Sequence, residues 1–130
     1  MTANIPCILL YHEVDDGSRP LLNHYFINIG PKVFAAHART LARYFKPISV
    51  EELRSAWASG QDVRDRVLMT FDDGYRAAVL NAGPILADLG LDSIWFVNCA
   101  FWRNDHVFWL SQLMWIKEQG LLSPFIQMAR

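Results

Sequence analysis

Two adjacent aspartates, Asp72 and Asp73, stand where an apolar stretch ends and a glycine, Gly74, follows. Residues 67–71 predict a buried strand, and the residues from Arg76 onward predict a helix. Strand-to-helix junctions of this kind are where α/β folds place their chemistry. One carboxylate could bind a divalent cation while the other accepts a proton. The alternative is structural: the pair would cap the helix and shape the turn, with Gly74 supplying the permissive backbone.

Strand-like and helix-like segments alternate along the chain, which predicts an α/β fold of parallel construction. The predicted strands cover residues 5–11, 67–71 and 93–98, with a short extended piece at Ile48. The predicted helices cover residues 31–45, 49–60, 76–89 (divided into two pieces by Gly83-Pro84), 107–119 and part of 121–130. A capping-box pair, Ser49 and Glu52, marks the start of the second helix. The polar residues 12–30 predict a long loop.

Composition restricts the classes of partner. The 130 residues are 52% hydrophobic and 19% charged, which predicts one globular domain with a sizeable core. A net charge of -1 offers no basic surface for nucleic acid or an anionic membrane, whereas an uncharged sugar suits it. No secretory signal or membrane span is evident, so we expect a cytoplasmic protein. Cys7 and Cys99 are expected to be buried free thiols.

Several segments together resemble a known family. Residues 70–75, Thr-Phe-Asp-Asp-Gly-Tyr, resemble the first motif of the polysaccharide deacetylases, the NodB-homology group called carbohydrate esterase family 4. Residues 8–14 resemble that family's opening strand, which often ends in Tyr-His, here Tyr11 and His12. Residues 84–98 are similar to the helix and strand that follow the first motif. The resemblance runs in order from about residue 6 to about residue 109, and it implies a (β/α) barrel of the NodB-homology type.

The resemblance also implies an activity and roles for four residues. The activity is metal-assisted hydrolysis that removes acetyl groups from an N-acetylated polysaccharide or oligosaccharide, a carbohydrate substrate. Asp72 would be the general base and Asp73 a ligand of the divalent metal, which is often zinc in the family. His12 and Tyr75 would lie at the substrate. From the residues alone, His12 could equally be a structural histidine that bonds a loop carbonyl.

The family's second motif supplies two further histidine ligands at close spacing, and the 130 residues contain no such pair. The four histidines are widely separated: His12, His24, His37 and His106. The sequence therefore predicts a partial barrel truncated before the second metal-binding motif, with residues 1–130 forming the N-terminal portion of a single deacetylase-like domain. The isolated chain would be inactive because one aspartate is too few ligands for zinc.

Two other functions stay open from the sequence. One is hydrolysis of a related cyclic amide, because deacetylase-like domains include such enzymes. The other is a non-catalytic carbohydrate-binding or assembly remnant, in which sugar binding would not depend on Asp73. In either case the partial barrel leaves unpaired strand edges, and these favour self-association.

Overall fold

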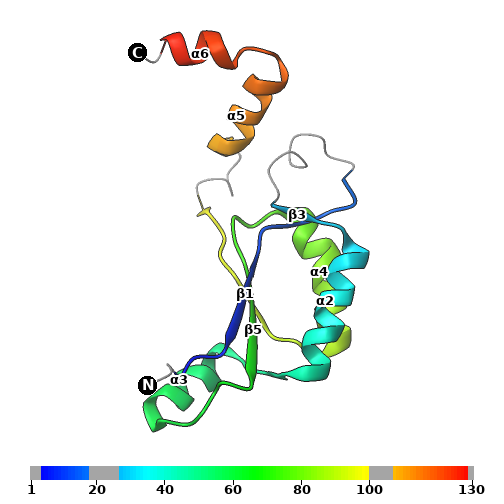
Figure 1. Cartoon of the computed structure of the whole chain (residues 1–130), viewed down its shortest axis with the longest axis vertical. Coiled ribbons are helices and arrows are strands. Elements are labelled where there is room, and N and C mark those ends of the chain that lie inside the picture. The colour runs from blue at the N-terminus through cyan, green and yellow to red at the C-terminus, as the bar shows by residue number, and fades with distance from the viewer. Residues whose placement is uncertain (1–3, 18–26, 100–106, 129–130) are drawn as a thin grey trace.

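The computed structural model describes residues 4–17, 27–99 and 107–128 of the 130-residue chain. Within those ranges strands and helices alternate, so the predicted α/β class is confirmed (Figure 1). The strands are β1 (Cys7–Tyr11), β2 (Glu13–Val14), β3 (Asn28–Ile29), β4 (Lys46–Pro47), β5 (Arg66–Phe71) and β6 (Ser93–Trp95). The helices are α2 (Pro31–Tyr44), α3 (Val50–Ser59), α4 (Arg76–Leu89), α5 (Trp109–Glu118) and α6 (Leu122–Met128).

Strand β5 is the centre of a four-stranded parallel sheet. Strand β1 pairs with it along the whole of β1, from Cys7 opposite Val67 to Tyr11 opposite Phe71. Strand β4 pairs with the beginning of β5, and β6 pairs with its end. Because β1 occupies one edge of β5 over these same residues, β4 and β6 share the other edge. The parallel construction predicted from the alternating elements is confirmed.

Helices α2 and α4 cover one face of this sheet, and an aromatic cluster lies at its centre (Figure 1). The Phe71 ring stacks on Trp95, with 4.0 Å between ring centroids and 7° between ring planes. Tyr11 stacks on the Phe71 ring at 5.6 Å, and Phe34 of α2 meets Tyr11 edge-on at 5.1 Å. These contacts fix the last residue of β5, which directly precedes the aspartate pair.

The opposite face of the sheet is covered only in part. Leu68 packs there in a second apolar cluster, whose other buried members are Ile48, Leu53, Ala56 and Val63. Two of these residues, Leu53 and Ala56, come from α3. Strand β1 turns alternate side chains to this face, and Ile8 and Leu10 are 52% and 55% exposed.

Two local predictions are wrong. Helix α4 runs unbroken through Pro84, although Gly83-Pro84 predicted a division into two pieces. Pro84 is exposed, and α4 buries side chains on both sides of it, from Ala77 to Leu86, so packing outweighs the one hydrogen bond that proline cannot make. Strand β6 ends at Trp95 rather than at residue 98, and Phe96, just beyond it, is 54% exposed.

The predicted loop over residues 12–30 contains structure. Strands β2 and β3 form a second, two-stranded parallel sheet, with Glu13 opposite Asn28 and Val14 opposite Ile29. The Asn81 side chain of α4 donates to the carbonyl oxygen of Val14 at 2.8 Å and ties this sheet to the main body. His24 and His106 lie outside the described residues.

The remaining sequence predictions have mixed outcomes. His37 is exposed, as expected for its helix. Both cysteines are free, but Cys99 is exposed and Cys7 only half-buried, so the expectation of buried thiols is wrong for Cys99. The last predicted helix is confirmed as α5, and α6 follows it after Gly120. In the described ranges no helix combines the length and apolar character that crossing a bilayer requires.

The capping box of α3 gives a test of the fold. The Ser49 hydroxyl accepts from the Glu52 backbone amide at 3.2 Å, and the Glu52 carboxylate accepts from the Ser49 amide at 2.9 Å. Ser49→Ala leaves the first turn without this partner, so we expect the free energy of unfolding to fall by about 1 kcal/mol. Chemical denaturation measures it. Ser55→Ala, exposed on the same helix, is the control, and an equal effect of both changes would contradict the assignment.

Candidate functional site

The aspartate pair lies in a tight turn directly after β5. The Asp72 amide still donates to the carbonyl oxygen of Tyr11 at 2.9 Å, which extends the contact with β1 by one residue. Asp73 and Gly74 then take φ values of 67° and 69°, in the left-handed region. Aspartate is one of the few residues other than glycine that adopts this conformation readily. The backbone therefore turns sharply before α4 begins.

The aspartates do not cap α4. The N-cap residue of this helix is Tyr75, and no side chain hydrogen-bonds its first turn. Among the described residues, the Asp72 and Asp73 carboxylates form no hydrogen bond or ion pair, and both residues are half-buried. The capping part of the structural alternative is therefore wrong, whereas its other part is confirmed, because Asp73 and Gly74 form the turn with left-handed backbones. Two carboxylates are left available to a ligand.

His12 lies at the same edge of the sheet as the aspartates. It follows Tyr11, whose partner in β5 is Phe71, so His12 and Asp72 are the next residues along two paired parallel strands. His12 is half-buried, and it makes no hydrogen bond to a loop carbonyl among the described residues. The structure brings together the three residues that the sequence placed at one end of the sheet.

Tyr75 adds a buried hydroxyl to this edge. Its Oη is shielded from solvent and has no hydrogen-bond partner among the described residues. Its ring meets Phe108, just before α5, at 6.2 Å between centroids. Burial raises the pKa of Tyr75, and the nearby carboxylates of Asp73 and Glu13 raise it further. The phenol therefore stays neutral and can donate a hydrogen bond.

Two further carboxylates near this edge were missed by sequence reasoning. Glu13 is completely buried, and Asp15 is 6% exposed. The Asp15 amide donates to the Asn28 side chain at 3.0 Å, and the Asp15 carboxylate accepts from the Gly17 amide at 3.3 Å. Charged residues in a polar segment predict an exposed loop. Only the pairing of β2 with β3, which is not local in sequence, buries them.

The donor set does not complete a metal site. In the described ranges, no group of three or more histidine, cysteine, aspartate or glutamate side chains is arranged to hold a metal ion. A catalytic zinc site normally has three protein ligands. Asp73 could be one such ligand, and the described residues do not fit a zinc ion by themselves.

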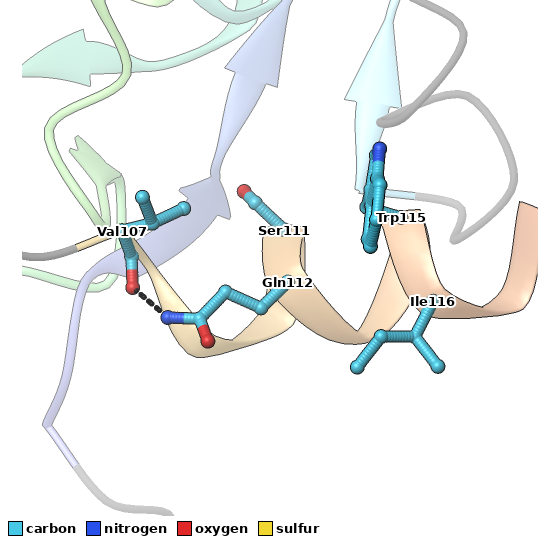
Figure 2. A pocket seen from close by; sticks show the side chains of 5 residues that line it. All are labelled: Val107, Ser111, Gln112, Trp115 and Ile116. Atoms are coloured by element: carbon cyan, nitrogen blue, oxygen red, sulfur yellow. Dashed lines mark hydrogen bonds between the residues drawn. The ribbon is translucent and has the colours of Figure 1, made fainter. Parts of the chain in front are cut away.

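An apolar hollow of about 420 Å³ lies along α5. Figure 2 shows its lining, which comes from a single stretch of chain: Val107, Ser111, Gln112, Trp115 and Ile116. The Gln112 side chain donates to the carbonyl oxygen of Val107 at 2.6 Å and closes one end. The described lining residues include no carboxylate, histidine or thiol, so they lack the groups for hydrolysis. The strand ends are therefore the better candidate site.

Solved structures match the chain, although no protein-family model and no curated protein does. The deacetylase PplD from Streptococcus pyogenes, solved in complex with acetate, is 22% identical with a TM-score of 0.61, over 70% of this chain and 41% of that one. IcaB from Ammonifex degensii is 25% identical with a TM-score of 0.58, over 71% and 37%. The de-N-acetylase from Aggregatibacter actinomycetemcomitans is 21% identical with a TM-score of 0.57, over 69% and 36%.

The chain has the fold of the polysaccharide deacetylases. The resemblance predicted from residues 70–75 and their flanking segments is confirmed. The chain spans between 36% and 41% of the length of these three solved deacetylases. Identities in this range establish a shared fold, and a fold can host several activities.

The turn that carries the aspartates of this deacetylase fold makes a test at Gly74. A Cβ added there would lie 3.0 Å from Cγ1 of Val97, in a backbone conformation that L side chains rarely adopt. We expect Gly74→Ala to lower the free energy of unfolding by roughly 2 kcal/mol or more, from backbone strain and overpacking together.

Gly60→Ala is the matched control for this change. Gly60 has a φ of 71°, and a Cβ there would meet nothing within 4 Å. The free energy of unfolding of Gly60→Ala should therefore fall only by the contribution of backbone strain, about 1 kcal/mol. Thermal and urea denaturation of the two variants measure the difference. Equal losses would show that Val97 does not restrict the turn.

Proposed function

We propose that residues 1–130 form the N-terminal portion of a single metal-dependent deacetylase domain, a partial (β/α) barrel. Its reaction is hydrolysis of the amide bond in an N-acetylated polysaccharide or oligosaccharide. One observation carries the proposal: two half-buried carboxylates, which have no partner among the described residues, lie beside His12 in a fold shared with solved deacetylases. The parallel sheet and the length of the solved relatives support the partial barrel.

The reaction requires a proton acceptor, and Asp72 is assigned that role. A water oxygen attacks the acetyl carbonyl carbon, and one water proton passes to the Asp72 carboxylate. The carbon–nitrogen bond then breaks as the nitrogen takes up the proton that Asp72 accepted, which regenerates the carboxylate, and acetic acid and the free amine of the sugar leave. The hydrogen bond from the Asp72 amide to Tyr11 fixes the backbone of this residue during the transfer. A base in a fixed position lowers the cost of orienting water.

The other three residues are assigned to bind the metal ion and the sugar. Asp73 is assigned as a ligand of a divalent cation, zinc in this proposal, because its carboxylate has no hydrogen bond or ion pair to the described residues and its left-handed backbone is held by the turn. The remaining ligands would come from polypeptide outside the described residues. Tyr75 is assigned to line the sugar site, and His12 to contact the sugar from the end of β1.

A chimera tests this activity. The chain replaces the matched segment of IcaB from Ammonifex degensii, and acetate release from a chitin oligosaccharide is measured. We expect the chimera to release acetate and the isolated 130-residue chain to release little. Asp72→Asn in the chimera should lower kcat by about 100- to 10,000-fold, because the proton acceptor is lost while the shape is kept.

Asp88→Asn is the matched control for the activity assay. Asp88 is exposed near the end of α4, whereas the aspartate turn precedes the start of this helix. Acetate release should therefore be unchanged in this variant. A folded chimera that releases no acetate would refute the proposed deacetylase activity. Retained activity in Asp72→Asn would refute the base assignment.

The metal assignment has its own test. In the chimera, Asp73→Ala should weaken zinc binding by about 10- to 100-fold or more. Substitution of residues that only support the metal ligands already causes a loss of this size. Competition with a chromophoric chelator measures the affinity directly. If Asp73→Ala binds zinc like the parent, the ligand assignment is wrong. Sugar binding that survives both chelator and Asp73→Ala would favour a non-catalytic carbohydrate-binding module.

A further inference from the structure

His12 is the single residue between two sheets. Tyr11, before it, ends β1, and the Tyr11 carbonyl oxygen accepts from the Asp72 amide at 2.9 Å. Glu13, after it, begins β2, and the Glu13 amide donates to the Ile27 carbonyl oxygen at 3.1 Å. Both neighbours of His12 are thus held by main-chain hydrogen bonds. The direction of the His12 side chain therefore depends on the positions of both sheets.

The second sheet, formed by β2 and β3, is too small to keep its place alone. Each strand has two residues, and an isolated pair of strands is marginally stable in water. Val14 of β2 is completely buried in the main apolar cluster, which also contains Ala78 and Ala82 of α4. This burial holds the sheet against the main body. The hydrophobic effect has no direction, however, so it does not fix how β2 lies.

Asn81 of α4 adds a directional contact to β2. Its side-chain amide donates to the carbonyl oxygen of Val14 at 2.8 Å, a distance typical of a well-formed hydrogen bond. The bond is partly buried, and a hydrogen bond is electrostatically stronger there than in water. Helix α4 also begins directly after the aspartate turn. The helix that follows Asp72 and Asp73 therefore also holds the strand that follows His12.

We propose that Asn81 is a positioning residue for His12. Its hydrogen bond to Val14 fixes the direction of β2, and β2 in turn sets where the His12 side chain lies relative to the aspartate pair. The inference rests on the proposed function, in which His12 contacts the sugar. Asn81 needs no contact with the sugar or the metal ion for this role, because it acts on a main-chain carbonyl of β2.

A double-mutant cycle in the chimera with IcaB tests the proposal. Asn81→Leu removes the donor and keeps a side chain of similar size, and we expect it to lower kcat/KM for acetate release on the order of tenfold. In the His12→Ala background the same change should have less than about a twofold effect, because the side chain that Asn81 positions is gone. Zinc affinity should stay within about twofold, since the assigned ligand is Asp73.

Asn4→Leu is the matched control. The Asn4 side chain donates to the Gln61 carbonyl oxygen at 2.7 Å, so this change removes the same kind of hydrogen bond before the start of β1, at the other end of that strand from His12. It should leave kcat/KM unchanged in both backgrounds. Asn81→Asp keeps the shape without the donor and is the variant to use if Asn81→Leu does not fold. An equal loss of kcat/KM from the Asn81 change with and without His12 would overturn the proposal.

Hydrogen exchange of the chimera separates this inference from the proposed function. The Glu13 and Asp15 amides donate to the carbonyl oxygens of Ile27 and Ile29. In Asn81→Leu these two amides should exchange about 2- to 10-fold faster, whereas the Asp72 amide should not change. In a chimera that releases no acetate, faster exchange would still support the positioning role while the deacetylase activity is refuted. Unchanged exchange of both amides would overturn this inference even in an active chimera.

Discussion

The pairing of β1 with β5 is the interaction on which the rest of the structure depends. It joins residues about 60 positions apart and places His12 beside Asp72, because residues that follow paired positions on parallel strands lie at the same edge. Parallel strands also require a long crossover. The chain between them provides it in α2, β4 and α3, and two of these elements pack onto β5 from either face. The candidate site is thus a product of the sheet rather than of any one segment.

The end of the pairing between β1 and β5 explains the conformation of the aspartate turn. The hydrogen bond from the Asp72 amide to Tyr11 is the last contact with β1, and the aromatic rings around Phe71 hold the residue before it. From there the chain must reverse into α4 within three residues. Two consecutive left-handed residues achieve this, and the missing side chain of Gly74 leaves room for Val97. The backbone that carries the two carboxylates is thus fixed by packed elements on both sides.

Sequence reasoning succeeded where the signal was local. The start of α3 was predicted because Ser49 and Glu52, three residues apart, form reciprocal hydrogen bonds in a capping box. The apolar residues before Asp72 predicted a buried strand. It failed where distant packing decides. Pro84 is a helix breaker locally, yet the buried face of α4 carries the helix through it. Glu13 looks like a loop residue until β3 pairs beside it, and the left-handed backbone of Asp73 has no signature of its own.

The chain therefore has two unsatisfied regions for different physical reasons. At the carboxyl end of β5, the two half-buried carboxylates of Asp72 and Asp73 lack an ion pair among the described residues. Such a grouping costs stability unless a cation or a bound ligand offsets it, which is the arrangement that functional sites show and structural ones avoid. Along β1, the unmet requirement is apolar surface and backbone pairing. A cation does not pair with a strand backbone, and a strand does not neutralise carboxylates, so the two regions differ in the chemistry that would complete them.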